Sequence, residues 1–597
     1  MKLTGGEIIA EYLIKQKVPY VIGIPGHGCL GLVDAFNSRK DKIRVLQVKQ
    51  EMCAVHMADA YYRLTGKPLA VFTSIGPGAI NTAIGIATAY VDSTSVLVMT
   101  GDTHTHMSGR GVLQEIERAH SSDFPSVLEP VVKRYWRATN VKQLPFILQR
   151  AFNQMLAGRR GPVLIDLPMD VQSDSVEVQL PEPEEHQPGG RMPGASEDIE
   201  KAVDLLSNAG RPVILAGGGV IASEAFEELR EIAEGIGAAV ITTMMGKSSF
   251  PENHPLYAWH AGSKGTTCGN KLASSADILM AVGCRFADET TSSYKRGVSF
   301  AIPPTKLIHI DIDPTEIGKN YPVEVGVTGD AKEILRQIAE KLKGKKIEPK
   351  EEYRNEIQKL KDEWVESLKE FRNSARTPMT ISCLLKEIRA CLDDDAIVVT
   401  SSGNTQAQVL QEFPFYVPKT CLTTGGFSTM GFTLPASLGA KLACPDKQVV
   451  GLLGDGDFMM TMQELSTAVQ YNLPVVIILA NNTGWISIKD LQMAAFGEER
   501  AIATDFVKDD GELYSPDFKQ IAEGFGCYSE RIKEAGEVRP ALKRAFESGK
   551  PAVVEVTVER TYPYSGSPAV GWWDVPVPAY LEDRRRKYEE EKKGEFK

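Results

Sequence analysis

Residues 454–482 read GDGDFMMTMQELSTAVQYNLPVVIILANN, and this stretch is the strongest indication of the fold that we predict for the chain. The apolar runs 449–453 and 475–479 predict two buried strands, and the segment between them carries apolar residues at helical spacing. In a parallel strand–helix–strand unit, the carboxyl ends of both strands lie at one edge of the sheet. Asp455 and Asn482, which follow the two strands, should therefore meet at that edge.

The turn after the first of these strands predicts a site for magnesium and phosphate. Gly454 and Gly456 let the backbone approach a ligand closely, and the helix N-terminus that follows favours an anion. Asp455 and Asn482 add a carboxylate and an amide oxygen, which are ligands that Mg²⁺ prefers. A plain Rossmann-like glycine turn is the alternative interpretation, but the spacing from GDG to the Asn481–Asn482 pair is more specific than GDG alone.

The same alternation of apolar strands and helices extends over three regions of the chain. It predicts an α/β fold in which each region is a doubly wound parallel sheet with helices on both faces. We place three domains at residues 1–180, 196–342 and 378–560, followed by a C-terminal tail at 561–597. The Pro-, Glu- and Gly-rich stretch 181–195 is a linker between the first two domains.

The composition is that of an ordinary globular protein and argues against some classes of partner. The net charge is −11 and no long basic run precedes the C-terminal segment, so we expect no nucleic acid. No apolar run approaches the length of a membrane span, so we expect no membrane contact. The N-terminus predicts an amphipathic helix with a Thr4–Glu7 capping box rather than a signal peptide, which favours a cytoplasmic location.

The spacing from GDG to the asparagine pair resembles the thiamine-diphosphate-binding signature of thiamine-dependent enzymes. The resemblance implies that the three regions are a pyrimidine-binding, a central and a diphosphate-binding domain. It also implies that Mg²⁺ is bound by the side chains of Asp455 and Asn482 and by the Gly484 carbonyl. Further residues that the resemblance places around the cofactor are Gly403, Asn404, Thr405, Gly454, Gly456, Asp457 and Trp485.

Glu51 is the candidate catalytic acid of the first region. It follows a strand and begins the apolar helix in KQEMCAVHMADAYYRLTG, so it should face an interior or an interface. An ordinary helix N-terminal acid is the alternative. Together with TSIGPGAINTAIGIATAYVDSTSVLVMTGD at 73–102, the segment resembles the pyrimidine-binding domain of thiamine-dependent enzymes. The matching Glu there bonds the pyrimidine N1′ and favours the imino tautomer, whose N4′ removes the thiazolium C2 proton to give the ylid.

The segment GGFSTMGFTLPA at 425–436 resembles the loop beside the pyrimidine in the same family. The resemblance implies that Met430 bends the cofactor into a V shape and that the Ser428 carbonyl accepts a hydrogen bond from N4′. A methionine that only fills the core is the alternative for Met430.

The middle region resembles acetolactate synthase in particular, through RPVILAGGGV at 211–220 and KLIHIDIDPTEIGKN at 306–320. In that enzyme this domain binds FAD without a redox role. Many relatives keep the domain without a nucleotide, so FAD stays open here. Plausible dinucleotide positions are Gly217, Gly218, Gly219, Arg285, Asp311 and Asp313.

The substrate side departs from acetolactate synthase. Residues 25–28 read PGHG where that family has PGG. Residues 486–492 read ISIKDLQ, where that family has a run that contains a Met and a Trp. The Gly-His-Gly turn and WWDVPV at 572–577 resemble the trihydroxycyclohexanedione hydrolase of inositol catabolism. His27 is a candidate proton donor to an alkoxide, or else only a residue that caps a turn. Gln114 is a further candidate to face the substrate.

The function that we predict is thiamine-diphosphate-dependent formation or cleavage of a carbon–carbon bond, which is transferase or lyase chemistry. The first choice is decarboxylation and carboligation of a 2-oxo acid as in acetolactate synthase, which would place the enzyme in branched-chain amino acid biosynthesis. A hydrolase or lyase of a cyclic 1,2-diketone or acyloin is the alternative, and a non-catalytic scaffold is a third possibility. In this family two chains build each active site, so we expect a homodimer or homotetramer.

Overall fold

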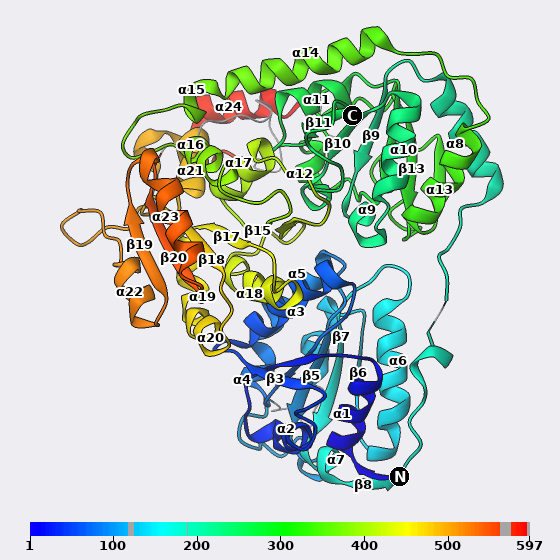
Figure 1. The fold of residues 1–597 in the computed structure, drawn as a ribbon, viewed down its shortest axis with the longest axis vertical. Coiled ribbons are helices and arrows are strands. Elements are labelled where there is room, and N and C mark those ends of the chain that lie inside the picture. Colours follow the sequence, from blue (N-terminus) through cyan, green and yellow to red (C-terminus); the bar gives the residue numbers. More distant parts are fainter. Residues whose placement is uncertain (117–123, 188, 561–574, 594–597) are drawn as a thin grey trace. The chain divides into compact units, whose positions relative to one another are not determined.

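The computed structural model describes residues 1–116, 124–187, 189–560 and 575–593, so the first half of the WWDVPV segment, residues 572–574, lies outside the described residues. Three six-stranded sheets organise the described chain, and every strand pairing recorded within them is parallel (Figure 1). Helices lie between most of the successive strands, so the α/β fold with three parallel sheets is confirmed.

The N-terminal sheet has the strand order β3-β2-β4-β5-β7-β6. Its helix α1 begins with the predicted capping box, because the Thr4 side chain accepts from the Glu7 backbone and the Glu7 side chain accepts from the Thr4 backbone. The strands are β2 (Tyr20–Gly23), β3 (Arg44–Gln47), β4 (Ala70–Thr73), β5 (Leu97–Asp102), β6 (Arg134–Arg137) and β7 (Val163–Pro168). The helices are α1 (Gly5–Lys15), α2 (Leu30–Asn37), α3 (Glu51–Thr65), α4 (Pro77–Ile80), α5 (Ala83–Val91), α6 (Leu144–Leu156) and α7 (Met169–Ser173), and β1 (Lys2–Thr4) pairs with β8 (Ser175–Glu177).

The middle sheet has the order β11-β10-β9-β12-β13-β14. The strands are β9 (Pro212–Ala216), β10 (Ala239–Thr242), β11 (Tyr257–His260), β12 (Ile278–Val282), β13 (Lys306–Asp311) and β14 (Val325–Thr328). The helices are α8 (Ser196–Asn208), α9 (Gly218–Ser223), α10 (Phe226–Ile236), α11 (Thr267–Ser274), α12 (Asp288–Thr291) and α13 (Ala331–Leu342), followed by α14 (Glu351–Ser367) and α15 (Lys369–Arg372).

The third sheet has the order β16-β15-β17-β18-β20-β19 and contains the two strands that flank the GDG turn. Its strands are β15 (Ile397–Thr400), β16 (Cys421–Thr423), β17 (Val449–Gly454), β18 (Val476–Asn481), β19 (Tyr528–Ile532) and β20 (Ala552–Thr557). The helices are α16 (Ile381–Arg389), α17 (Asn404–Glu412), α18 (Thr433–Ala443), α19 (Asp455–Thr461), α20 (Leu465–Gln470), α21 (Ile486–Phe496), α22 (Phe518–Gly524), α23 (Ala535–Glu547) and α24 (Glu582–Glu591).

The strand–helix–strand unit is present, but its helix is not continuous. β17 and β18 pair in parallel, with Gly454 opposite Ala480, as the apolar runs predicted. Between them, a 3-10 turn at Met462–Glu464 separates α19 from α20. Glu464 is fully buried in this turn and Val469 is exposed, so the single apolar helix face expected from the spacing does not extend to Val469.

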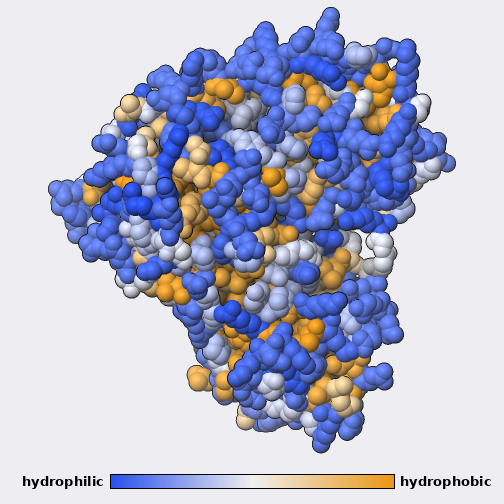
Figure 2. Space-filling model, viewed as in Figure 1, coloured by the Kyte–Doolittle hydropathy of each residue, from blue (hydrophilic) through white to orange (hydrophobic). Residues whose placement is uncertain are grey.

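By packing, the chain divides into two compact units. The first comprises residues 1–190, 424–449 and 459–475, and the second comprises 191–423, 450–458 and 476–597. Polar residues cover much of the face drawn in Figure 2, with apolar residues in smaller patches between them. None of the described helices combines the length and the apolar character that crossing a membrane requires.

Candidate active site

Glu51 begins α3 in the first unit, and its carboxylate is buried. The residue is 8% exposed, and its Oε2 accepts a hydrogen bond of 3.0 Å from the Asn81 amide. A side chain at Gly78 would come within 3.1 Å of the other carboxylate oxygen, so the turn after β4 lies directly against Glu51. The helix therefore presents an acid to the exit of the neighbouring strand.

A second buried acid, Glu464, holds the start of this helix and was not predicted from the sequence. Its Oε1 accepts from the Lys49 backbone at 2.9 Å, and its Oε2 accepts from the Thr467 hydroxyl at 2.6 Å. Burial raises the pKa of Glu464. The available signal was the single charged residue in the segment MTMQELSTA. Because Lys49 lies just before α3, Glu464 fixes the backbone that positions Glu51.

His27 and Gln114 reach the same edge of the N-terminal sheet as Glu51. His27 is exposed at the exit of β2, where the Gly28 N–H donates to the Ser74 hydroxyl at 3.1 Å. Gln114 is exposed, with φ of +71°, and its carbonyl oxygen would lie 2.0 Å from a Cβ at Gly76. Gly76 itself has φ of +52°, so both its conformation and this contact require glycine. The structure thus brings the two candidates to the turn that contacts Glu51.

The loop that carries Ser428 and Met430 also lies in the first unit. Both residues are half-buried, and Ser428 has φ of +51°. Gly431, the next residue after Met430, has φ of +80°, and a Cβ there would lie 3.4 Å from the Met52 side chain, next to Glu51 in α3. The following helix α18 packs closely on α3, because a Cβ at Gly439 would meet the Met57 carbonyl at 2.1 Å.

Asp455 lies in the second unit at the exit of β17 and is 2% exposed. Its carboxylate accepts from the Gly456 N–H at 3.0 Å and from the Gly484 N–H at 3.2 Å. Burial raises the pKa of Asp455 to about 6. The predicted meeting of the two strand exits is therefore observed, because Asp455 directly contacts the backbone that follows Asn482.

The two asparagines after β18 differ in what they contact. Asn481 donates at 2.9 Å to both Glu555 and the Ser515 hydroxyl, and it accepts from the Thr483 N–H at 3.1 Å. Asn482 is half-buried. The donor set of Asp455, Asn482 and the Gly484 carbonyl consists of hard oxygens, which fits Mg²⁺.

The Trp485 ring packs against one side of the GDG turn. A Cβ at Gly456 would lie 2.0 Å from the Trp485 ring, whereas a Cβ at Gly454 would meet nothing within 4 Å. Gly456 is therefore needed for packing within the protein, while Gly454 leaves its side open to a ligand. Asp457 is 4% exposed and accepts from the Ser401 hydroxyl, which ties the turn to the exit of β15.

Gly403, Asn404 and Thr405 lie where the chain leaves β15 and enters α17. Gly403 precedes the helix with φ of +104°, a conformation that favours glycine. Asn404 is half-buried and donates to Asp490, and Thr405 is buried. Burial raises the pKa of Asp490 to about 6. Gly403, Asn404 and Thr405 thus lie at a helix N-terminus, where backbone N–H groups favour an anion.

The candidate dinucleotide positions of the middle sheet have contacts within the protein. The Gly217 and Gly219 N–H groups donate to the Val282 and Gly283 carbonyls, and a Cβ at Gly217 would lie 2.1 Å from the Gly283 oxygen. Gly218 and Arg285 are half-buried beside them. Asp311 accepts from the Asp313 N–H at 2.9 Å, and Asp313 accepts from the Thr315 N–H. Close backbone packing thus accounts for this glycine run without a nucleotide.

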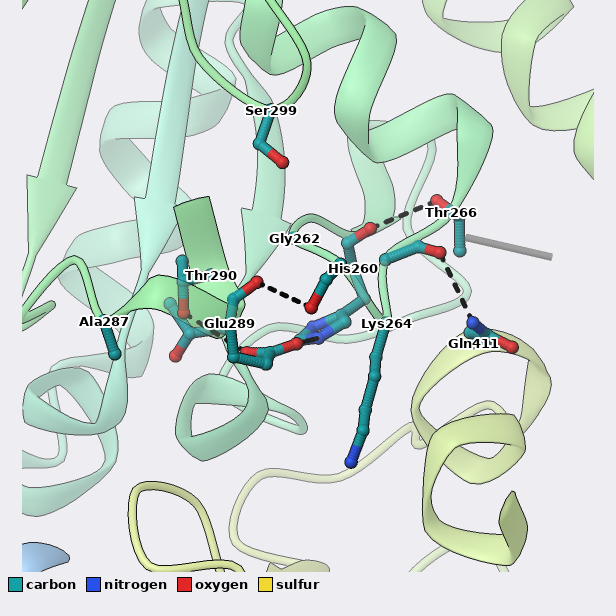
Figure 3. Close-up of polar contacts among 12 residues, drawn as sticks. His260, Gly262, Lys264, Thr266, Ala287, Glu289, Thr290, Ser299 and Gln411 are labelled. Carbon is teal, nitrogen blue, oxygen red and sulfur yellow. Dashed lines mark hydrogen bonds and ion pairs between the residues drawn. The ribbon is translucent and has the colours of Figure 1, made fainter. Parts of the chain in front are cut away.

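A buried polar cluster at the exit of β11 is a further feature that was not predicted from the sequence (Figure 3). His260 is fully buried, and its Nε2 lies 3.7 Å from the Glu289 carboxylate. Lys264 points away from this pair, and its amine donates to the Gln406 side chain of α17 at 3.0 Å. Burial lowers the pKa of Lys264 to about 8. Lys264 therefore ties the middle sheet to the helix that begins at Asn404.

Comparison with known proteins identifies all three regions. Family models of the thiamine pyrophosphate enzymes match the N-terminal TPP binding domain at residues 3–122, the central domain at 199–338 and the C-terminal TPP binding domain at 401–556. A probable acetolactate synthase large subunit of Methanococcus aeolicus is 36% identical over 571 residues, which are 93% of this chain and 92% of the relative. The acetolactate synthase large subunit of Corynebacterium glutamicum is 36% identical over 93% of this chain and 87% of its own length. The large subunit of acetolactate synthase isozyme 3 from Escherichia coli is 33% identical over 94% of this chain and 96% of its own length.

Proposed function

The chain belongs to the thiamine pyrophosphate enzyme family and is similar to its acetolactate synthase large subunits, and from this premise we propose that it is a carboligase that acts on 2-oxo acids. The reaction is decarboxylation of one 2-oxo acid and addition of the remaining carbons to a second carbonyl compound. The observation that carries this proposal is the buried Glu51 carboxylate at the start of α3, hydrogen-bonded to Asn81 against the Gly76–Gly78 turn. A scaffold without activity would not need an acid there.

Glu51 would hold the proton shared with the pyrimidine ring of the cofactor. Thiamine diphosphate, when bound, supplies a carbon acid that can become a nucleophile, and the protein supplies orientation and proton transfer. Ser428 would present its carbonyl to the amino group of the pyrimidine, and Met430 would support the bend of the cofactor. Both roles are supported by the position of Gly431, where an added Cβ would lie 3.4 Å from the Met52 side chain, so this loop lies beside the start of α3.

Asp455, Asn482 and the Gly484 carbonyl would hold Mg²⁺. The support is the contact of Asp455 with the Gly484 N–H and the engagement of Asn481 elsewhere, which leaves Asn482 as the available amide of the pair. Gly403, Asn404, Thr405, Gly454, Gly456, Asp457 and Trp485 would surround the diphosphate. The helix N-terminus at Asn404 and the open side of Gly454 favour this placement.

His27 and Gln114 would face the substrate, because both lie at the turn that contacts Glu51. The comparisons favour the synthase over the alternative diketone hydrolase, since the three relatives named are acetolactate synthases. Bound FAD, the homodimer or homotetramer, the cytoplasmic location and a place in branched-chain amino acid biosynthesis stay predictions.

The test is to incubate the purified chain with thiamine diphosphate, Mg²⁺ and pyruvate and to identify the products. We expect carbon dioxide and acetolactate, with one acetolactate formed for two pyruvates consumed. Cleavage of a cyclic 1,2-diketone without turnover of pyruvate would instead support the hydrolase. Inactivity toward both, with the cofactor bound, would contradict the carboligase. A visible absorption spectrum of the same sample decides whether flavin is present.

A further inference from the structure

Arg63, near the end of α3, bridges two buried carboxylates. Its guanidinium forms an ion pair with Asp59 at 2.5 Å and another with Asp92 at 3.1 Å. The side chains of both aspartates are fully buried, and that of Arg63 is 10% exposed. Buried charges are stable only when they are paired and hydrogen-bonded, so the three side chains depend on one another.

Asp92, which caps α5, also binds the loop that carries Ser428. Its Oδ1 accepts from the Gly426 N–H at 2.9 Å and its Oδ2 from the Gly425 N–H at 3.2 Å. One carboxylate thus engages two successive backbone N–H groups, and bonds of this kind to an ionised acceptor are stronger than bonds between neutral groups. Asp59 makes no such contact among the described residues, although it shares the same arginine.

Two further contacts fix the other end of the loop. The Thr88 hydroxyl, one turn before Asp92 in α5, lies 2.7 Å from the Thr429 hydroxyl. The Arg63 guanidinium also lies over the Phe432 ring, 5.5 Å from its centroid. The segment from Gly425 to Phe432 is therefore held at both ends by α3 and α5.

The loop needs this support because part of its backbone is in an unfavourable conformation. Ser428 has φ of +51°, in the left-handed region that residues with a Cβ rarely adopt. Such a conformation persists only when the surrounding structure holds it. The Asp92 bonds to Gly425 and Gly426 and the Thr88–Thr429 contact lie within three residues of Ser428, whose carbonyl has a role under the proposed function.

We propose that Asp92 is a positioning residue that sets the conformation of the Gly425–Gly431 loop, and that Arg63 holds Asp92 in place. The side chain of Asp92 is fully buried, so Asp92 would act through Ser428 and Met430 rather than on the cofactor or the substrate. The proposal rests on the proposed function only for the roles of those two residues. The anchoring of the loop itself can be measured without cofactor.

The experiment compares Asp92→Asn with the matched control Asp59→Asn. Each removes one negative charge from Arg63, but only Asp92 contacts the loop. In the protein without cofactor, backbone amide exchange in a peptide spanning residues 424–431 should become at least about ten-fold faster in Asp92→Asn, because bonds to an ionised acceptor are lost. Asp59→Asn should leave exchange of this peptide near the wild-type rate. Equal exchange in the two variants would overturn the proposal.

A catalytic readout separates this proposal from the proposed function. Asp92→Asn should lower kcat with pyruvate by at least about ten-fold and leave the affinity for thiamine diphosphate nearly unchanged, because the loop is misplaced rather than removed. Unchanged kcat together with faster loop exchange would overturn the positioning role. If the wild-type protein is inactive but the 424–431 peptide exchanges faster in Asp92→Asn than in Asp59→Asn, the proposed function is contradicted and the anchoring of the loop by Asp92 is not.

A double variant guards against loss of folding. Arg63→Met combined with Asp92→Asn leaves Asp59 as the one acid of this group, and Arg63→Met combined with Asp59→Asn, which leaves Asp92 instead, is its control, so each double variant loses the arginine and one acid. Faster exchange of the 424–431 peptide in the first double variant than in the second supports the proposal. The reverse order, or no difference, overturns it.

Discussion

Asn481 and Asn482 are adjacent, yet the protein uses them differently. The Asn481 amide is fully engaged with Glu555, Ser515 and Thr483, whereas Asn482 is half-buried near the Asp455–Gly484 contact. Sequence alone gives two equivalent amides, and the resemblance to the family assigned the metal to the second. The hydrogen bonds give a physical reason for that assignment, because the amide oxygen of Asn481 already accepts from the N–H and the hydroxyl of Thr483.

The two asparagines should therefore separate stability from metal binding. Asn481→Ala removes the donor to Oε1 of the buried Glu555, whose Oε2 keeps its bond from Arg531, and should lower the free energy of unfolding by about 1–3 kcal/mol. Asn482→Ala should change that free energy by less than about 0.5 kcal/mol. It should instead weaken Mg²⁺-dependent binding of thiamine diphosphate by at least about ten-fold. Urea unfolding without cofactor and calorimetric titration with it measure the two effects, and the opposite pattern would move the metal ligand to Asn481.

At the residue scale, the sequence predicted best the features that arise from local chemistry. The Thr4–Glu7 capping box depends on near neighbours and agrees with the structure, whereas Gly456, which we expected to let a ligand approach, is instead required by the Trp485 ring. Glu464, Asp92 and Lys264 were missed because their partners are distant in sequence. Glu464 binds the backbone of Lys49, and Asp92 binds that of Gly425 and Gly426. A single charged residue within an otherwise uncharged segment, such as Glu464 in MTMQELSTA, is the signal that could have found such residues.

At the scale of elements, α17 links the candidate diphosphate site to a buried acid. The helix begins at Asn404 and ends at Glu412, which is 2% exposed and accepts from Ser382 of α16 at 2.7 Å and from Gln408 at 3.1 Å through one oxygen. The other oxygen lacks a hydrogen-bond partner among the described residues. Burial accordingly raises the pKa of Glu412 from 4.5 to about 7.

The stability of the protein should therefore depend on pH through Glu412. The folded chain holds this proton more tightly than the unfolded chain, so this group stabilises the fold fully below pH 4.5, and the stabilisation is lost as pH rises to about 7. Glu412→Gln keeps the neutral shape at every pH. Above pH 7 the variant should be more stable than the wild type by up to about 3 kcal/mol, and the difference should shrink toward pH 5. Urea unfolding of both proteins from pH 5 to 8 measures this difference, and a constant difference would assign the effect to another group.

Strand positions were predicted well because buried parallel strands are continuous apolar runs. β17 and β18 lie within two residues of the predicted runs. The helix between them was predicted as one element, but it is interrupted at Met462–Glu464. The sequence there does not reveal the interruption, because residues 459–470 contain no proline or glycine. The buried Glu464, which accepts from the distant Lys49 backbone, lies in the 3-10 turn.

At the scale of the whole molecule, three parallel sheets could be predicted from the order of strands and helices, and the comparisons with known proteins match the same three regions. The oligomer could not be predicted in this way. A homodimer or homotetramer with shared active sites rests on the resemblance to the family. Such sharing leads to a definite prediction about mixed assemblies of two inactive variants.

Coexpression of Glu51→Gln with Asp455→Asn tests whether two chains share each site. Each variant alone should be nearly inactive. If Glu51 and Asp455 of one site come from different chains, a mixed dimer holds one site with both residues intact, and random pairing should restore about a quarter of the wild-type activity. Steady-state activity of the coexpressed proteins, compared with each variant alone, gives the answer. Failure to restore activity in a sample shown to contain mixed dimers would place both residues in one chain.

The proposed function depends above all on Glu51 promoting removal of the proton from the thiazolium C2 of bound thiamine diphosphate. Hydrogen–deuterium exchange at that carbon, followed by NMR after rapid quenching, measures the step directly and needs no substrate. In Glu51→Gln with the cofactor bound to the same extent, we predict exchange slower than in the wild type by about 10²–10⁴-fold, the usual contribution of a positioned acid or base. Exchange as fast as in the wild-type protein would contradict this role of Glu51.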